Sequence, residues 1–344
     1  EVLRHLGSKV EYLDKDTVKI DSSNINTCET PYELMDKMRA SFVVMGPLLS
    51  RFKKAYTKAP GGCNIGARPI DLHLKGFEAL GAESKISDEE ISIDANGELV
   101  GNEVYLDFPS VGATQNIIMA ATLAEGETII ENAAKEPEIV DLASFLSKMG
   151  AKIKGAGTST ITIEGVEKLT GTRHTIIPDR IEAASYMIAA AMTKGNVTIN
   201  NVIGSHIRPI IAKLIEMGAK VDEIEDEDII KVSVDKKLKP TNIQTLPYPG
   251  FPTDAQAQFM ALMTICDGES KIQETVFENR FMHVEQLNKM GAAIATSGNR
   301  ATIVGVDKLH GAEVKATDLR AGAALVIAAL VAEGQTKVSD IYLS

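Results

Sequence analysis

The sequence contains no tryptophan, and aromatic residues make up only 5% of its 344 positions. Surfaces that bind single-stranded nucleic acids stack bases on such side chains, so a surface of that kind is not expected. The formal net charge of −11 also argues against the broad basic face that a nucleic-acid backbone requires. We therefore expect small-molecule partners and no nucleic acid, with arginines gathered locally wherever an anion binds.

Cysteine is scarce as well, and Cys28, Cys63 and Cys266 are too scattered for a disulfide framework or a zinc site. The six histidines show no metal-ligand spacing, so we expect neither a metal nor another cofactor. The longest apolar run, 321–332, is too short to span a bilayer and is typical of a buried helix. Without a visible signal peptide, we expect a cytoplasmic protein with no membrane partner, and Glu1 in place of Met predicts a longer natural chain.

What the sequence does contain is an internal repeat of about 70 residues. Two phrases alternate, and each joins apolar residues at helical spacing to a glycine suited to a helix end, followed by a Val- or Ile-rich strand. The first phrase has its glycine at Gly7, Gly81, Gly150, Gly218 and Gly291, and the second at Gly126, Gly195, Gly268 and Gly334. The first and last units are incomplete, so we expect an α/β fold of helix–strand units truncated at both ends. A solenoid is the alternative.

A glycine-rich loop surrounds one cysteine, in the stretch APGGCNIGARP at 59–69. The two glycines before Cys63 allow the backbone to approach a ligand closely. The guanidinium of Arg68 is near enough in sequence to lower the pKa of this thiol and to hold a phosphate. A plain turn with an incidental cysteine is the alternative interpretation.

Polar residues precede several of the expected helices. The residues are Ser110, Asp179, Asp254 and Asp318. Each alone is explained as an N-cap. Their recurrence at comparable positions favours helix N-termini that share a role in binding anions. The acidic run 222–228, in contrast, predicts a solvated hairpin turn rather than a metal site.

At 60–73, PGGCNIGARPIDLH, the sequence closely resembles the UDP-N-acetylglucosamine 1-carboxyvinyltransferases. The resemblance continues in MDKMRAS, SVGAT, TLAEGETIIENAAKEPEIVD, IPDRIEA, PGFPTDAQAQF, ETVFENRFMHV and TDLRA. It implies an inside-out α/β fold with helices inside and sheets outside, in two domains, 1–176 and 177–344. The first domain carries the cysteine loop and the UDP-binding turns. The second is incomplete and is normally completed by absent N- and C-terminal segments.

The reaction that the resemblance implies transfers the enolpyruvyl group of phosphoenolpyruvate to the 3'-hydroxyl of UDP-N-acetylglucosamine and releases phosphate. It opens peptidoglycan synthesis, and the complete enzyme is expected to be a monomer that the epoxide fosfomycin inhibits. The methylene carbon must gain a proton while the attacking hydroxyl loses one. By resemblance, Cys63 is the proton donor and Asp254 the candidate general base.

The substrate-binding residues are implied by the resemblance too. Arg39 and Arg68 match arginines that hold phosphate and sugar groups, and Asp318 and Arg320 match a phosphate-side pair. The remaining matches are Arg68, Pro69, Ile70, Asp71 and Leu72 for the uridine end, Ser110, Val111 and Gly112 for the diphosphate, and Val276 for a further contact. Phe108 replaces a lysine common in the family, so the charge is lost and the contact is either absent or made by the backbone alone.

Two other functions stay open at this stage. One is that of the sister family, the 3-phosphoshikimate 1-carboxyvinyltransferases, which shares the repeat but lacks the cysteine loop and the FENRFMHV phrase. The other is a UDP-sugar-binding fragment without turnover. The family's Lys-Asn pair that grips phosphoenolpyruvate would lie before residue 1, and a further phosphate-binding arginine would lie after residue 344.

Overall fold

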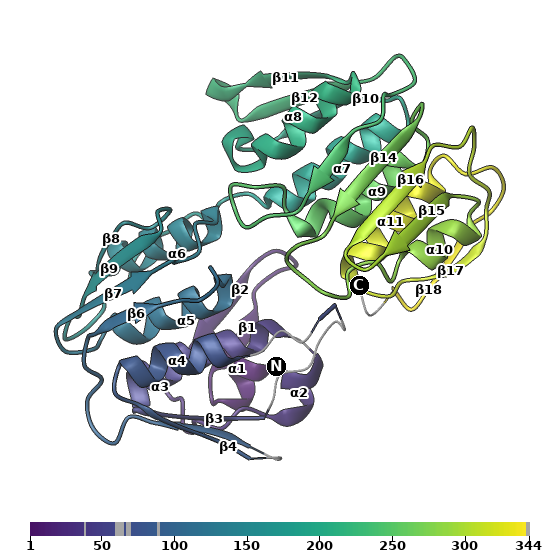
Figure 1. Cartoon of the computed structure of the whole chain (residues 1–344). Helices are drawn as coiled ribbons and strands as arrows, with labels where there is room; N and C mark the ends of the chain where they lie inside the picture. The colour runs from purple at the N-terminus through teal and green to yellow at the C-terminus, as the bar shows by residue number, and fades with distance from the viewer. Residues whose placement is uncertain (38, 59–64, 67–69, 88–89, 342–344) are drawn as a thin grey trace. The chain divides into compact units, whose positions relative to one another are not determined.

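The computed structural model describes residues 1–37, 39–58, 65–66, 70–87 and 90–341. These residues form two compact units (Figure 1). The first contains the described residues between 1 and 62 and between 69 and 176. The second contains Ile65, Gly66 and the residues from Ile177 onward.

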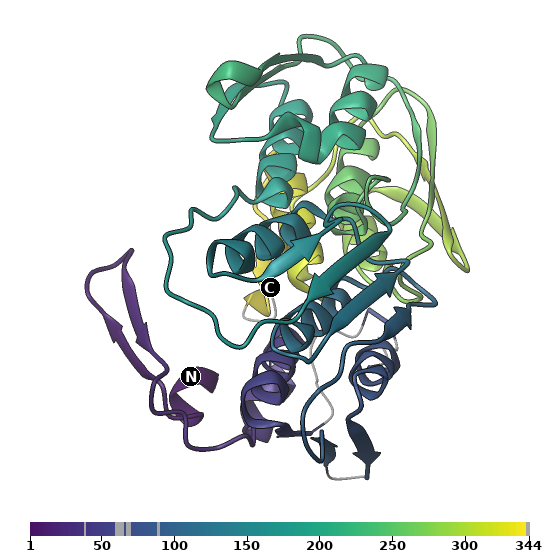
Figure 2. The same cartoon turned by 90° about the vertical axis from the view of Figure 1, so that its left-hand side faces the viewer.

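In the described part of the first unit, the strands form three sheets. The strands are β1 (Lys9–Tyr12) with β2 (Val18–Asp21), then β3 (Lys54–Thr57), β4 (Glu83–Ile86) and β5 (Ile91–Asp94), and then β6 (Glu103–Tyr105), β7 (Glu127–Glu131), β8 (Lys152–Lys154) and β9 (Thr160–Glu164). The helices are α1 (Val2–His5), α2 (Tyr32–Lys37), the 3-10 helix η1 (Arg39–Val44), α3 (Met45–Phe52), α4 (Asp71–Ala79), α5 (Val111–Ala121) and α6 (Pro137–Lys148). The β1–β2 hairpin projects from this unit, and most of its residues are exposed (Figure 2).

The described part of the second unit also contains three sheets. The strands are β10 (Asn196–Asn200), β11 (Lys220–Ile224) and β12 (Ile229–Ser233), then β13 (Asn242–Gln244), β14 (Glu269–Gln273), β15 (Ala293–Ser297) and β16 (Arg300–Val304), and then β17 (Glu313–Lys315) and β18 (Lys337–Ser339). The α-helices are α7 (Arg180–Met192), α8 (Arg208–Met217), α9 (Gln256–Met263), α10 (Val284–Lys289) and α11 (Leu319–Ala329), and the 3-10 helices are η2 (Gly204–Ile207), η3 (Glu225–Glu227) and η4 (Thr253–Ala255).

Helices occupy the centre of each unit and strands its outside. In the second unit, α7, α9 and α11 pack against one another, and every residue of α9 is buried (Figure 1). In the first unit, α5 has the same role, because α3 and α4 both pack against it. Since neighbours surround the central helices, their sequences are apolar on most faces rather than on a single stripe. The predicted inside-out α/β fold is confirmed, and the apolar run at 321–332 begins within α11.

The predicted repeat is visible in the sheets. One four-stranded sheet in each unit has the same order and pairing, β6-β7-β9-β8 in the first and β13-β14-β16-β15 in the second. In both, the first pair of strands is parallel and the other two pairs are antiparallel. At the repeat glycines the backbone has positive φ, as expected, except at Gly195, where the preceding Lys194 takes the left-handed conformation.

A second pair of glycines marks the repeat where β9 and β16 end. Gly305 N–H donates to Gly268 O at 2.9 Å, and Gly165 N–H donates to Gly126 O at the same distance. A methyl group on Gly305 would overlap the carbonyl oxygen of Cys266, and one on Gly165 would overlap a carbonyl in the equivalent place. The strand ends can approach the neighbouring helix ends only where the side chain is hydrogen.

We expect Gly305→Ala to lower the free energy of unfolding by about 3 kcal/mol, because a backbone carbonyl must move to accommodate the methyl group. Urea unfolding measures this change. Gly171→Ala is the matched control, since no atom lies within 4 Å of an added methyl group there, and its effect should stay within about 0.5 kcal/mol. Equal stability of the two variants would contradict the close approach.

The acidic run 222–228 forms the hairpin turn that was predicted. It covers the end of β11, the 3-10 helix η3 and the residue before β12, and the two strands pair antiparallel. Within the described residues, no group of His, Cys, Asp and Glu side chains has the arrangement of a metal site. None of the helices in the same residues is long and apolar enough to cross a bilayer.

Candidate active site

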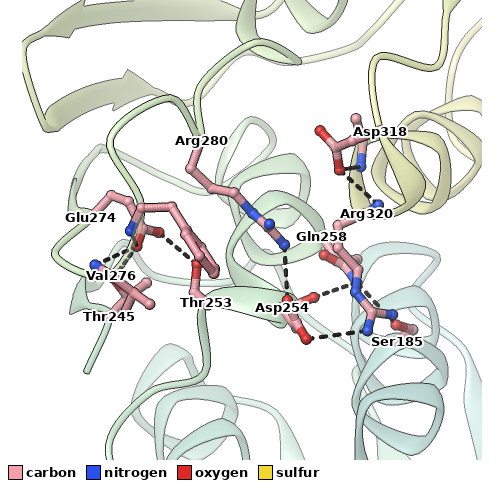
Figure 3. Close-up of polar contacts among 12 residues, drawn as sticks. Ser185, Thr245, Thr253, Asp254, Gln258, Glu274, Val276, Arg280, Asp318 and Arg320 are labelled. Carbon is pink, nitrogen blue, oxygen red and sulfur yellow. Dashed lines mark hydrogen bonds and ion pairs between the residues drawn. The ribbon is translucent and has the colours of Figure 1, made fainter. Parts of the chain in front are cut away.

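Asp254 lies in η4, directly before the buried helix α9, and two arginines hold its carboxylate (Figure 3). Its Oδ1 accepts a hydrogen bond from Arg280 Nη2 at 2.9 Å, and its Oδ2 accepts one from Arg320 Nη2 at 3.2 Å. The side chain of Asp254 is 42% exposed, whereas that of Arg280 is 4% exposed. One face of the carboxylate is therefore fixed by protein while another remains open to a reactant.

Arg280 comes from the loop after β14, and its guanidinium carbon lies 5.4 Å from the centre of the Phe277 ring. A guanidinium at this depth needs a charged partner, because removing an unpaired charge from water costs several kcal/mol. Asp254 supplies that partner. No pattern in the sequence predicted a role for Arg280, although it lies in the FENRFMHV phrase.

Arg320 enters the site from the first turn of α11. The carboxylate of Asp318 caps this helix by accepting hydrogen bonds from Arg320 N at 2.9 Å and Ala321 N at 3.0 Å. Asp318 is therefore an N-cap that orients the first turn of the helix. The cap places the Arg320 side chain beside Asp254.

Of the four polar residues expected to precede helices, three cap them and one does not. Ser110 accepts a hydrogen bond from Ala113 N at 3.3 Å, and Asp179 accepts from the first residues of α7. Asp318 caps α11 as described. Asp254, in contrast, directs its carboxylate to two arginines and makes no cap hydrogen bond. This difference separates the candidate general base from the residues that cap helices.

In the first unit, the residues predicted to bind the nucleotide lie at the starts of two helices. Asp71 and Leu72 open α4, with Ile70 before them, and Ser110 precedes Val111 and Gly112 at the start of α5. The first N–H groups of a helix carry partial positive charge and favour anions. Two starts of this kind are therefore available for phosphate groups.

The buried side-chain amide of Asn116 connects α3, α4 and α5 in the first unit. Asn116 Oδ1 accepts from Gly46 N at 2.9 Å, and its Nδ2 contacts His73 Nδ1 at 2.9 Å. The His73 ring in turn lies against Gly112, where an added methyl group would be 3.1 Å from Cε1. The start of α5 is thus packed on a side chain of α4.

Several predicted residues lie outside the described part of the chain or are described only by their backbone. Cys63, Arg68 and Pro69 are outside it, and the backbone of Arg39 lies in η1. Val276 is half-buried, and its N–H donates to Glu274 Oε1 at 2.9 Å. Phe108, at the position of the family's lysine, is 41% exposed and precedes the cap Ser110.

His283 follows Arg280 by three residues and is 1% exposed. Burial lowers its pKa to about 4, and the nearby Asp318 carboxylate offsets this effect only in part. Arg280 contributes in both directions, since its charge lowers the pKa of His283 and a backbone hydrogen bond raises it. The imidazole is therefore neutral in the folded protein at neutral pH.

This burial predicts a pH dependence of stability. The unfolded chain binds a proton at His283 below about pH 6.5 and the folded chain does not, so stability is full above that pH and falls as the pH approaches 4. Between pH 7 and 4, the wild type should lose about 3 kcal/mol more than His283→Gln. Urea unfolding at several pH values measures the difference, and parallel curves for the two proteins would contradict it.

Comparison with known proteins agrees with this fold. The profile of the EPSP synthase family, 3-phosphoshikimate 1-carboxyvinyltransferase, matches residues 1–344. The UDP-N-acetylglucosamine 1-carboxyvinyltransferase of Finegoldia magna is 70% identical over 99% of this chain and 81% of its own length. An enzyme of the same name, numbered 2, from Carboxydothermus hydrogenoformans is 61% identical over the same shares.

The solved structures share little sequence identity with this chain, so they support its fold and not its activity. The enolpyruvyl transferase NikO from Streptomyces tendae matches 99% of this chain and 81% of its own, with a TM-score of 0.88 and 24% identity. An EPSP synthase from Acinetobacter baumannii matches 99% of this chain and 82% of its own, with a TM-score of 0.70 and 20% identity. The chain therefore belongs to the EPSP synthase family and, within it, to the UDP-N-acetylglucosamine 1-carboxyvinyltransferases.

Proposed function

We propose that this protein transfers the enolpyruvyl group of phosphoenolpyruvate to the 3'-hydroxyl of UDP-N-acetylglucosamine, the first committed step of peptidoglycan synthesis. The observation that carries the proposal is 70% identity, over nearly the whole chain, to an enzyme named for this reaction. The Asp254 carboxylate, which two arginines hold, also supports the proposal because a carboxylate can accept the proton of the attacking hydroxyl. We assign the reaction to the cytoplasm and to a monomer.

The chemistry assigned to Asp254 is removal of a proton. The 3'-oxygen bonds to the carbon that carries the phosphate while the hydroxyl proton passes to the carboxylate, and the methylene carbon gains a proton from Cys63. Loss of phosphate and of one proton from the resulting methyl group then restores the double bond. The arginines hold Asp254 in one orientation, which is what a base needs in order to meet its proton at hydrogen-bonding distance.

The anionic ends of the substrates are assigned to the arginines and the helix starts. Arg320 is 26% exposed and retains donors beyond its contact with Asp254, so we assign it to an anionic group of phosphoenolpyruvate. In the first unit, we assign the uridine end to Ile70, Asp71 and Leu72 and the diphosphate to Ser110–Gly112. We keep Arg39, Arg68, Pro69 and Val276 as substrate contacts and Cys63 as proton donor, by resemblance.

Phosphate release in the presence of both substrates tests the proposal. We expect the protein at its natural length to release phosphate with phosphoenolpyruvate and UDP-N-acetylglucosamine. Residues 1–344 expressed by themselves should bind the UDP-sugar with little or no release. Turnover with shikimate 3-phosphate in place of the UDP-sugar would overturn the proposal in favour of the sister activity, for which the family profile is named.

A further inference from the structure

A second buried carboxylate, that of Glu274, lies beside the candidate active site (Figure 3). Glu274 follows β14 directly and is 2% exposed. Its Oε1 accepts hydrogen bonds from Thr245 Oγ1 at 2.8 Å, Val276 N at 2.9 Å and Phe277 N at 3.2 Å. Its Oε2 accepts one from Thr253 Oγ1 at 3.0 Å.

Four donors on one buried carboxylate indicate a rigid arrangement. Within the described residues, the side chain is held by hydroxyl and backbone N–H groups rather than by an ion pair. Hydrogen bonds to a charged acceptor are about twice as strong as neutral ones, and burial penalises the loss of any of them. Glu274 therefore resists displacement along several directions at once.

Its four partners belong to segments that meet at Asp254. Thr253 is the residue before Asp254 in η4. Val276 and Phe277 begin the loop that ends at Arg280, and the Phe277 ring lies against the Arg280 guanidinium. Thr245 comes from the chain just after β13, and its N–H donates to Gln273 O at 3.0 Å, which joins the network to the sheet. One carboxylate thus connects the base, its buried arginine and the sheet.

We propose that Glu274 is a positioning residue for the transfer reaction, acting through Thr253 on the general base Asp254 and through the 276–280 loop on Arg280. The inference rests on the proposed function and deepens it, because it names the group that sets the base against the reacting hydroxyl. Errors of an ångström in such geometry cost rate rather than binding, since the hydroxyl and the base react only at close range.

Substitution of Thr253 tests this positioning role, because Thr253→Val removes the hydrogen bond to Glu274 and keeps the volume of the side chain. We expect kcat for phosphate release to fall about tenfold, with KM for UDP-N-acetylglucosamine changed less than about threefold. Thr253→Ser restores the hydroxyl and should return kcat to within about twofold of the wild type.

Thr264→Val controls for stability. Thr264 is fully buried at the end of α9, and its hydroxyl donates to Ala261 O at 2.6 Å, so the same change removes a buried hydrogen bond away from the network. We expect this variant to lower the melting temperature at least as much as Thr253→Val while keeping kcat within about twofold. All four proteins are assayed at their natural length.

The outcomes separate the inference from the proposed function. An unchanged kcat in Thr253→Val, a Thr253→Ser variant as slow as Thr253→Val, or an equally slow Thr264→Val would each overturn the positioning role while the wild type remains active. A wild type that releases no phosphate would overturn the proposed function, and the inference with it.

Discussion

Asp254→Asn is expected to lower kcat for phosphate release about 1,000-fold, because an amide cannot accept the proton of the attacking hydroxyl. KM for UDP-N-acetylglucosamine should change little, since the substitution keeps the shape of the side chain and one acceptor for the arginines. Steady-state phosphate release at several concentrations of the UDP-sugar gives both constants.

Asp226→Asn is the matched control for this experiment. Asp226 lies in the exposed 3-10 helix η3 between β11 and β12, so the same chemical change should leave kcat and KM unaltered. Because Asp254→Asn removes the carboxylate that pairs with the buried Arg280 guanidinium, urea unfolding is measured beside the kinetics. A folded Asp254→Asn variant that retains more than about a tenth of the wild-type kcat would rule out the role of general base.

Fosfomycin is expected to add one molecule to this protein, at Cys63. Attack on an epoxide requires the thiolate, and the other two thiols resist ionisation. Burial raises the pKa of Cys266 to about 12, and burial also raises the pKa of Cys28. Both thiols therefore ionise less readily than an ordinary cysteine. Intact mass followed by peptide mapping measures the number of adducts and their position.

Substitutions of the cysteines make the outcome decisive. Cys63→Ser should abolish both the mass increase and the loss of activity caused by fosfomycin. Cys28→Ser should react like the wild type, because its thiol is half-buried and its pKa is raised. An adduct mapped to Cys28 or Cys266, or none at all, would contradict the assignment of Cys63 as the reactive cysteine.

Features set by short stretches of chain could be predicted from the sequence. The helix-end glycines, the cap residues Ser110, Asp179 and Asp318 and the 222–228 hairpin depend on local backbone geometry and on hydrogen bonds spanning a few residues. The repeat of these signals predicted the helix–strand units, and the family resemblance implied their inside-out arrangement. Local preference and burial point to the same structure in each of these segments.

The sequence predicted only part of the site around Asp254. Asp254 and Asp318 precede helices in similar patterns, yet Asp318 is a cap and Asp254 is an ion-pair partner. Asp254 lies inside the 3-10 helix η4, so the residues at the N-cap positions of η4 and α9 are Pro252 and Ala255 instead. Local pattern alone does not distinguish these geometries.

The pairing of Asp254 with its two arginines depends on the tertiary structure and could not be predicted from the sequence. Arg280 lies 26 residues from Asp254 in the chain and Arg320 lies 66 residues away. The Arg320 contact follows from how α9 and α11 pack. Glu274 has no sequence signal of its own, because a glutamate after a strand is usually solvated. Local order is specified by hydrogen bonds between near neighbours, whereas the partners of a buried charge depend on packing between distant segments.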